Sequence, residues 1–209
     1  FPHIAPHSAD ELERVINQVG PEYISAFIVE PILGTSSAAL VPPDDYFLTV
    51  RQICDQYNIL LIIDEVQSGF ARTGKHWFGI EHWGVVPDIM VMAKGIANGA
   101  PVGATVTTDE IAHAWKGKTI STFGGNPVSM AALCATHAEL KACDAPANAE
   151  ARGAELRAGL EAIQGRHPWV GDVRGMGLMQ AMEIVKDPMT KEPDNDRTAA
   201  FLQATRDEG

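Results

Sequence analysis

Cysteine is scarce in this sequence, which has only Cys54, Cys134 and Cys143 among its 209 residues. Three thiols at these positions are too few for a disulfide framework and lack the spacing of a zinc site. We therefore expect no metal centre, and we expect the thiols to be buried and reduced, as is common in intracellular proteins. The seven histidines are scattered and form no metal-binding motif such as HExxH.

Long apolar runs and an excess of positive charge are also missing. Apolar runs such as residues 59–63 are far shorter than the roughly 20 residues that span a bilayer, so we expect no membrane segment. The chain carries 16 basic and 27 acidic residues, a formal net charge of −11. This acidic balance argues against a nucleic-acid partner, which requires a basic surface.

The chain begins at Phe1 and ends at Gly209, directly after a predicted helix at 198–207. We expect it to be a piece of a longer protein. The expected location is cytoplasmic. A mitochondrial location is left open, because a targeting segment before residue 1 would not be visible.

Apolar segments of strand length alternate with amphipathic helical patterns. The runs at 59–63 and 89–93 show no polar alternation, which is typical of strands buried on both faces of a parallel sheet. This order predicts an α/β fold with a mostly parallel sheet. Strands are predicted at 24–29, 59–63, 89–93, 102–107 and 178–185, and helices at 8–19, 46–57, 128–141, 149–164 and 198–207.

The composition shifts at residues 143–148, so we place a domain boundary near residue 145. Residues 1–145 are predicted to be part of a large cofactor-binding domain. Residues 146–209 are predicted to be part of a small C-terminal domain.

Asp64 and Lys94 stand out because each directly follows a predicted buried strand. The carboxyl ends of parallel strands meet at one edge of a sheet, where ligands bind in open α/β folds. A carboxylate in this position is poorly solvated and needs a cationic partner. A plain Asp64–Lys94 ion pair meets that need, and so does a cofactor that interacts with both groups.

Pyridoxal 5′-phosphate (PLP) is a cofactor that requires both groups. Its aldehyde condenses with a deprotonated lysine amine, and a carboxylate beside its ring nitrogen favours the protonated ring. A nucleotide site fits less well. The segment 69–76 nearly matches a phosphate loop, but His76 replaces the hydroxyl that binds Mg²⁺.

Several motifs, in order along nearly the whole chain, resemble those of class III PLP-dependent aminotransferases, including the alanine–glyoxylate and ω-amino-acid branch. They are EP at 30–31, LIIDEVQSGFARTG at 61–74, PDI at 87–89, AKG at 93–95, STFGGNP at 121–127 and VRGMGL at 173–178. The resemblance implies PLP fold type I, with the second half of the large, mostly parallel-sheet domain and part of a small α+β domain.

The resemblance also implies roles for individual residues. Lys94 would be the Schiff-base lysine and proton carrier, and Asp64 would hold the protonated ring nitrogen. Val66 would pack on one ring face, and Gln67 would bond to the phenolic oxygen. From the pattern alone, Val66 would be a core residue and Gln67 an exposed amide. Glu65 is expected to be a structural acid.

Thr122, together with Ser121, would bind the cofactor phosphate of a neighbouring subunit. Such a role requires a symmetric homodimer, with a tetramer as a larger alternative. The two hydroxyls precede a predicted helix N-terminus, which favours anions. From the pattern alone, the alternative for Thr122 is a simple capping hydroxyl.

The implied reaction moves an amino group from an amino acid or ω-amino donor to a 2-oxo acid such as pyruvate or glyoxylate. One alternative is a phospho-lyase that acts on an amino-alcohol phosphate with the same cofactor and scaffold. Another is a catalytically incomplete fragment, because the family's phosphate-binding turn, stacking aromatic and carboxylate-binding arginine are absent. The segment 34–37 also lacks an acidic residue that many members carry, which argues against ornithine and 4-aminobutyrate as donors.

Overall fold

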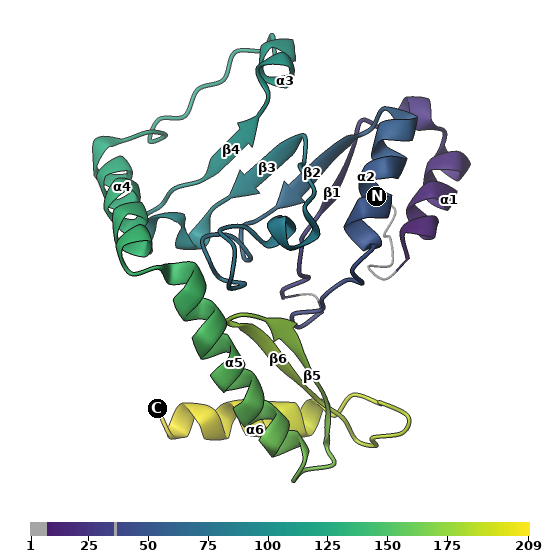
Figure 1. Ribbon diagram of the computed structural model, residues 1–209, viewed down its shortest axis with the longest axis vertical. Helices are drawn as coiled ribbons and strands as arrows, with labels where there is room; N and C mark the ends of the chain where they lie inside the picture. Colours follow the sequence, from purple (N-terminus) through teal and green to yellow (C-terminus); the bar gives the residue numbers. More distant parts are fainter. Residues whose placement is uncertain (1–7, 36) are drawn as a thin grey trace.

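The computed structural model describes residues 8–35 and 37–209, which contain one sheet of four strands and one of two (Figure 1). In the larger sheet the order is β1-β2-β3-β4, with β1, β2 and β3 parallel and β4 antiparallel to β3. The predicted mostly parallel α/β sheet is therefore confirmed. The strands are β1 (Ala26–Val29), β2 (Leu60–Asp64), β3 (Ile89–Met92), β4 (Ala104–Thr107), β5 (Val170–Met176) and β6 (Met179–Ile184).

Four of the helices form two groups around these sheets (Figure 1). α1 and α2 pack together beside the four-stranded sheet, whereas α5 and α6 pack against the β5–β6 hairpin. The helices are α1 (Ala9–Val19), α2 (Tyr46–Tyr57), α3 (Asp109–Ala114), α4 (Pro127–Ala142), α5 (Ala145–Gln164) and α6 (Asn195–Asp207), and the 3₁₀ turns are η1 (Pro21–Tyr23), η2 (Gly79–Trp83) and η3 (Lys94–Ala97). The domain boundary near residue 145 stays a prediction.

Local chemistry explains where two of the helices begin. Asn126 Oδ1 accepts a hydrogen bond of 2.9 Å from the Ser129 amide, and Pro127 occupies the first helical position of α4. The α6 helix begins before the predicted residue 198 because the Asp194 side chain caps it, accepting from the Arg197 amide at 2.9 Å.

The core lies between α2, α1 and one face of the four-stranded sheet. Phe47, Leu61 and Ile63 are completely buried there. On the other face Ile62 is half-buried, and its neighbour Ile28 on β1 is 58% exposed. The expectation that this sheet is buried on both faces is therefore wrong for the described residues, since α1 and α2 cover one face.

The cysteines correct a second expectation. Cys54 is buried in the core, and burial raises the pKa of its thiol to about 11, so the thiol is protonated at neutral pH. Cys134 and Cys143, expected to be buried, are exposed. The α4 helix that carries Cys134 has apolar side chains around its whole circumference, whereas only Ser129 is buried. Apolar neighbours in the sequence are therefore not enough to predict that the Cys134 and Cys143 side chains are buried.

Residues 8–35 and 37–209 contain no group of three or more His, Cys, Asp or Glu side chains that could hold a metal ion. In the same residues, no helix is both long and apolar enough to cross a membrane.

Candidate active site

Asp64 and Lys94 lie at the same edge of the four-stranded sheet. Asp64 is the last residue of β2 and is paired with Val91 of β3, and Lys94 follows β3 as the first residue of η3. Lys94 has a φ of 46°, in the left-handed region that side chains with a Cβ rarely adopt. Strained backbone of this kind is concentrated at functional sites. The predicted pair therefore shares one edge, and the lysine backbone there is strained.

The Asp64 carboxylate is half-buried and is held by the chain that follows it. Its Oδ1 accepts a hydrogen bond of 2.9 Å from the Val66 amide. Among the ion pairs of the described residues, none joins Asp64 to Lys94. The plain ion pair between Asp64 and Lys94 is therefore not formed in the described structure.

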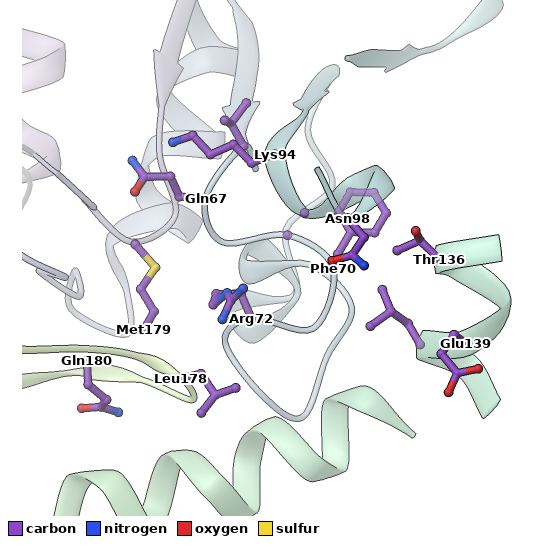
Figure 2. Close-up of a pocket in the computed structure, with 14 residues that line it drawn as sticks. Gln67, Phe70, Arg72, Lys94, Asn98, Thr136, Glu139, Leu178, Met179 and Gln180 are labelled. Atoms are coloured by element: carbon purple, nitrogen blue, oxygen red, sulfur yellow. The ribbon is translucent and has the colours of Figure 1, made fainter. Parts of the chain in front are cut away.

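A cleft of about 610 Å³ opens at this edge, and three of the predicted site residues line it: Val66, Gln67 and Lys94. Figure 2 shows Lys94 and Gln67 on the same side of the cleft. Contributions also come from α4 and from the β5–β6 hairpin, so the cleft lies between the two sheets. The other lining residues are Gly69, Phe70, Arg72, Gly95, Asn98, Thr136, Glu139, Leu140, Leu178, Met179 and Gln180.

Ser121 and Thr122 are placed elsewhere. Both are exposed in the segment between α3 and α4 and neither lines the cleft. Ser121 Oγ accepts a hydrogen bond of 3.0 Å from the Gly124 amide, which holds the turn before α4. The structure of this single chain therefore does not bring these two hydroxyls to Lys94.

The Gln67 amide is held by a small polar network that the sequence did not predict. Its Nε2 donates to Glu30 Oε2 at 3.3 Å, and the same oxygen accepts from the Gly34 amide at 3.1 Å. Thr35 Oγ1 lies 3.4 Å from Gln67 Nε2. Because Glu30 can only accept when ionised, the NH₂ group of Gln67 is directed towards it.

Glu65, next to Asp64, is completely buried and holds the segment after β2 in place. Its Oε2 accepts from Ser68 Oγ at 2.6 Å and from the Gly79 amide at 2.9 Å, and Oε1 accepts from the Ile80 amide at 2.8 Å. Burial raises the pKa of Glu65 above its usual value, although the three hydrogen bonds act in the opposite direction. These contacts agree with the structural role expected for this acid.

Replacing Glu65 by glutamine is expected to lower the free energy of unfolding of the full-length protein by about 1–3 kcal/mol. One amide NH₂ then faces a backbone N–H in place of an accepting oxygen. Because the pKa of Glu65 is raised in the folded state, the wild type gains stability relative to the variant as the pH falls through that folded pKa. Denaturant unfolding at a series of pH values measures both effects.

The exposed Glu155, paired with Arg152 on the surface of α5, supplies the control. Glu155→Gln is expected to change the free energy of unfolding by less than about 0.5 kcal/mol at any of these pH values. Equal effects of the two substitutions would show that Glu65 does not support this segment.

Comparison with known proteins identifies the chain. The family described as aminotransferase class-III matches residues 4–209. This chain belongs to the class III aminotransferases. Taurine–pyruvate aminotransferase of Bilophila wadsworthia is 43% identical over 212 residues, which cover 96% of this chain and 46% of that protein. The chain thus spans about half the length of the curated relatives it matches.

Solved structures give the same assignment. A Bacillus anthracis aminotransferase is 40% identical with a TM-score of 0.90, over 96% of this chain and 46% of that one. An (S)-enantioselective omega-transaminase from Thermomicrobium roseum is 39% identical with a TM-score of 0.84, over 90% and 43%. The fold is therefore that of the class III transaminases, PLP fold type I.

In this class III chain, several cleft residues had no role predicted from the sequence. Thr136 and Glu139 come from α4, which was predicted only as a helix, and Met179 and Gln180 come from the hairpin. The VRGMGL motif directly before residues 179–180 was the available signal for the hairpin. No local pattern marks Thr136 or Glu139.

Proposed function

We propose that the full-length protein is a PLP-dependent aminotransferase in which Lys94 is the catalytic residue. The placement of Lys94 carries this proposal: it lines the cleft beside the strand that ends in Asp64, and no ion pair within the described chain joins the two. An amine, a carboxylate and an amide donor are the groups that PLP requires. Lys94 and Gln67, which line the cleft, supply the amine and the amide, and Asp64, which ends the adjacent strand without lining the cleft, supplies the carboxylate.

Bound PLP supplies an aldehyde that condenses with amines and a ring that accepts the electrons released at the substrate Cα. Lys94 Nζ is the protein's amine. Lys94 would hold the cofactor through this amine and, when the amine is free, would act as the base that takes the proton from the substrate Cα and gives it back during the transfer. The exposed Lys94 side chain has room for this exchange of roles.

Three residues near Lys94 would contact the cofactor ring and fix its orientation. Asp64, held by the Val66 amide at 2.9 Å, presents a carboxylate that favours the protonated ring nitrogen. Gln67 Nε2 gives one hydrogen to Glu30, at 3.3 Å, and when the Thr35 hydroxyl donates to Gln67 Oε1, at 3.5 Å, the second Nε2 hydrogen would be free for the phenolic oxygen. Val66 lines the cleft and supplies an apolar surface for one face of the ring.

The protein is further proposed to act as a homodimer in which Thr122 and Ser121 bind the phosphate in the other subunit's site. Two observations support this role: both residues are outside the cleft, and the flanking Ile120 and Phe123 are 98% and 81% exposed. Apolar side chains so exposed are typical of a surface that a partner covers.

We also propose that residues 1–145 belong to a cofactor-binding domain and residues 146–209 to a small domain. The two separate sheets of the chain support this division.

The proposed substrates are an ω-amino acid as donor and pyruvate or glyoxylate as acceptor. The Bilophila relative is a taurine–pyruvate aminotransferase, which supports pyruvate and an ω-amino donor, and the Thermomicrobium relative is an omega-transaminase. The absence of an acid among the described residues 34, 35 and 37 agrees with this choice over ornithine.

Borohydride reduction of the full-length protein loaded with PLP, followed by peptide mass mapping, tests the cofactor and its anchor. The expected result is a pyridoxyl group on Lys94. Folded, PLP-treated protein without that adduct would contradict the proposal. Alanine formation from pyruvate with taurine or β-alanine tests the reaction, whereas phosphate release from phosphoethanolamine without a 2-oxo acid would identify a lyase.

A further inference from the structure

A loop beside the cleft is held in a strained backbone conformation. We define the 33–40 loop as residues 33–35 and 37–40. Leu33 and Leu40 close its base with two backbone hydrogen bonds of 3.0 and 3.1 Å. Ala38 and Ala39 have positive φ values, 48° and 57°, where a Cβ crowds the backbone. Such strain persists only when surrounding contacts hold it.

Arg174 of β5 makes those contacts from the other sheet. Its Nε donates to the Ala38 carbonyl at 3.0 Å, and its Nη2 donates to the Ser37 carbonyl at 3.3 Å. On its far side, Nη1 lies 2.8 Å from both Asp172 Oδ2 and Glu183 Oε2. The two carboxylates fix the plane of the guanidinium, so that its other donors are directed at the loop.

The opposite side of the 33–40 loop touches Gln67. Thr35 Oγ1 lies 3.5 Å from Gln67 Oε1 and 3.4 Å from Nε2. Gly34 packs so closely that a Cβ there would lie 2.5 Å from Gln67 Oε1. Outward movement of the loop removes these contacts and leaves the Gln67 amide with its bond to Glu30. The 33–40 loop therefore packs directly against the Gln67 side chain, which lines the cleft.

We propose that Arg174 is a positioning residue that holds the strained 33–40 loop against Gln67 and so fixes the Gln67 amide at the cleft. Holding the loop requires only contacts within this chain, whereas the effect on the cofactor rests on the proposed function. Because Arg174 belongs to the β5–β6 hairpin, the position of the small sheet is coupled to the cleft through this side chain.

Hydrogen exchange in the cofactor-free, full-length protein tests whether Arg174 holds the loop. Arg174→Lys keeps the charge but lacks the planar fork that reaches two carboxylates and two carbonyls. The amides of Leu33 and Leu40 are expected to exchange about tenfold faster than in the wild type. Unchanged exchange in β2 shows that the fold is intact.

Two further variants sharpen this measurement. Glu183→Gln leaves Arg174 in place but weakens one of its two supports, so a smaller acceleration in the same loop is expected. Arg152→Lys is the matched control, because Arg152 also pairs with a carboxylate but lies on the α5 surface. In Arg152→Lys, the amides of the 33–40 loop are expected to exchange at the wild-type rate.

Cofactor binding tests the link to Gln67. In Arg174→Lys the dissociation constant of PLP is expected to rise about three- to tenfold, because the Gln67 amide is no longer fixed. The pH at which the visible absorption of the bound cofactor changes is expected to shift by at least about 0.3 unit. A merely structural arginine would leave that pH unchanged, as Arg152→Lys is expected to do.

The outcomes separate the two proposals. Unchanged loop exchange in Arg174→Lys overturns the inference. Faster exchange with unchanged PLP affinity and absorption overturns its link to Gln67. If wild-type, full-length protein binds no PLP, the proposed function fails, and the exchange rates still decide whether Arg174 holds the loop.

Discussion

Replacing Lys94 by alanine in the full-length protein is expected to slow amino transfer by at least about 10⁴-fold while the protein stays folded. Lys94 is proposed to act both as the amine that anchors the cofactor and as the base that carries the proton, and no other lysine lines the described cleft. The structural cost is small, because the Lys94 side chain is exposed. Steady-state rates and denaturant unfolding measure the two quantities.

Lys75→Ala is a closely matched control for this substitution. Lys75 also has a left-handed backbone, with φ of 59° against 46° for Lys94, but it is not among the residues that line the cleft. Its removal is expected to change the rate by less than about twofold. Lys94→Arg keeps the charge without a suitable amine, and it is expected to be as inactive as Lys94→Ala. Retention of more than about 1% of the wild-type rate in Lys94→Ala would remove Lys94 from the mechanism.

The sheet edge and its two charged residues could be predicted because the signals are local. Apolar runs at 59–63 and 89–93 indicate strands, and the polar residue that follows each run lies at the strand's carboxyl end. Parallel pairing then brings Asp64 and Lys94 to one edge without further information. The roles given to both residues remain predictions, which the Lys94 variants address.

The contacts that support the cleft residues could not be predicted in this way, because they depend on which distant segments pack together. Glu30 reaches Gln67 through the parallel pairing of β1 with β2, and Arg174 reaches the Ala38 carbonyl across 136 residues of sequence. The β5 strand was also missed, because Gly171, Asp172, Arg174 and Gly175 interrupt its apolar pattern. It is stabilised by pairing with β6 and packing against α5.

Replacing Gly153 by alanine is expected to lower the free energy of unfolding by about 2–3 kcal/mol. Gly153 lies in α5, and a Cβ there would overlap the carbonyl of Gly177 in the β5–β6 turn. The turn cannot move away, because Gly177 is itself packed against the backbone of Thr73 and has a φ of 54°. Denaturant unfolding of the full-length protein measures the loss.

Gly159→Ala, in the same helix, is the control that separates the close contact at Gly153 from the general effect of replacing a helical glycine. Nothing lies within 4 Å of a Cβ at Gly159, so this substitution brings only the helix preference of alanine, a gain of about 0.5–1 kcal/mol. Opposite signs for the two variants mean that the close contact of α5 with the turn, rather than helix propensity, determines the result. Similar stabilities would mean that Gly153 does not face Gly177.

The contact between Gly153 and the β5–β6 turn also affects the position of residues that line the cleft. The turn that Gly153 touches continues into Leu178, Met179 and Gln180, which line the cleft, and the Leu178 amide donates to the Arg72 carbonyl at 3.0 Å. A Cβ at residue 153 therefore pushes the turn against the segment that carries Arg72. We expect Gly153→Ala to weaken PLP binding as well as stability, whereas Gly159→Ala leaves PLP binding unchanged. Loss of stability without loss of PLP affinity would mean that the hairpin does not shape the cofactor site.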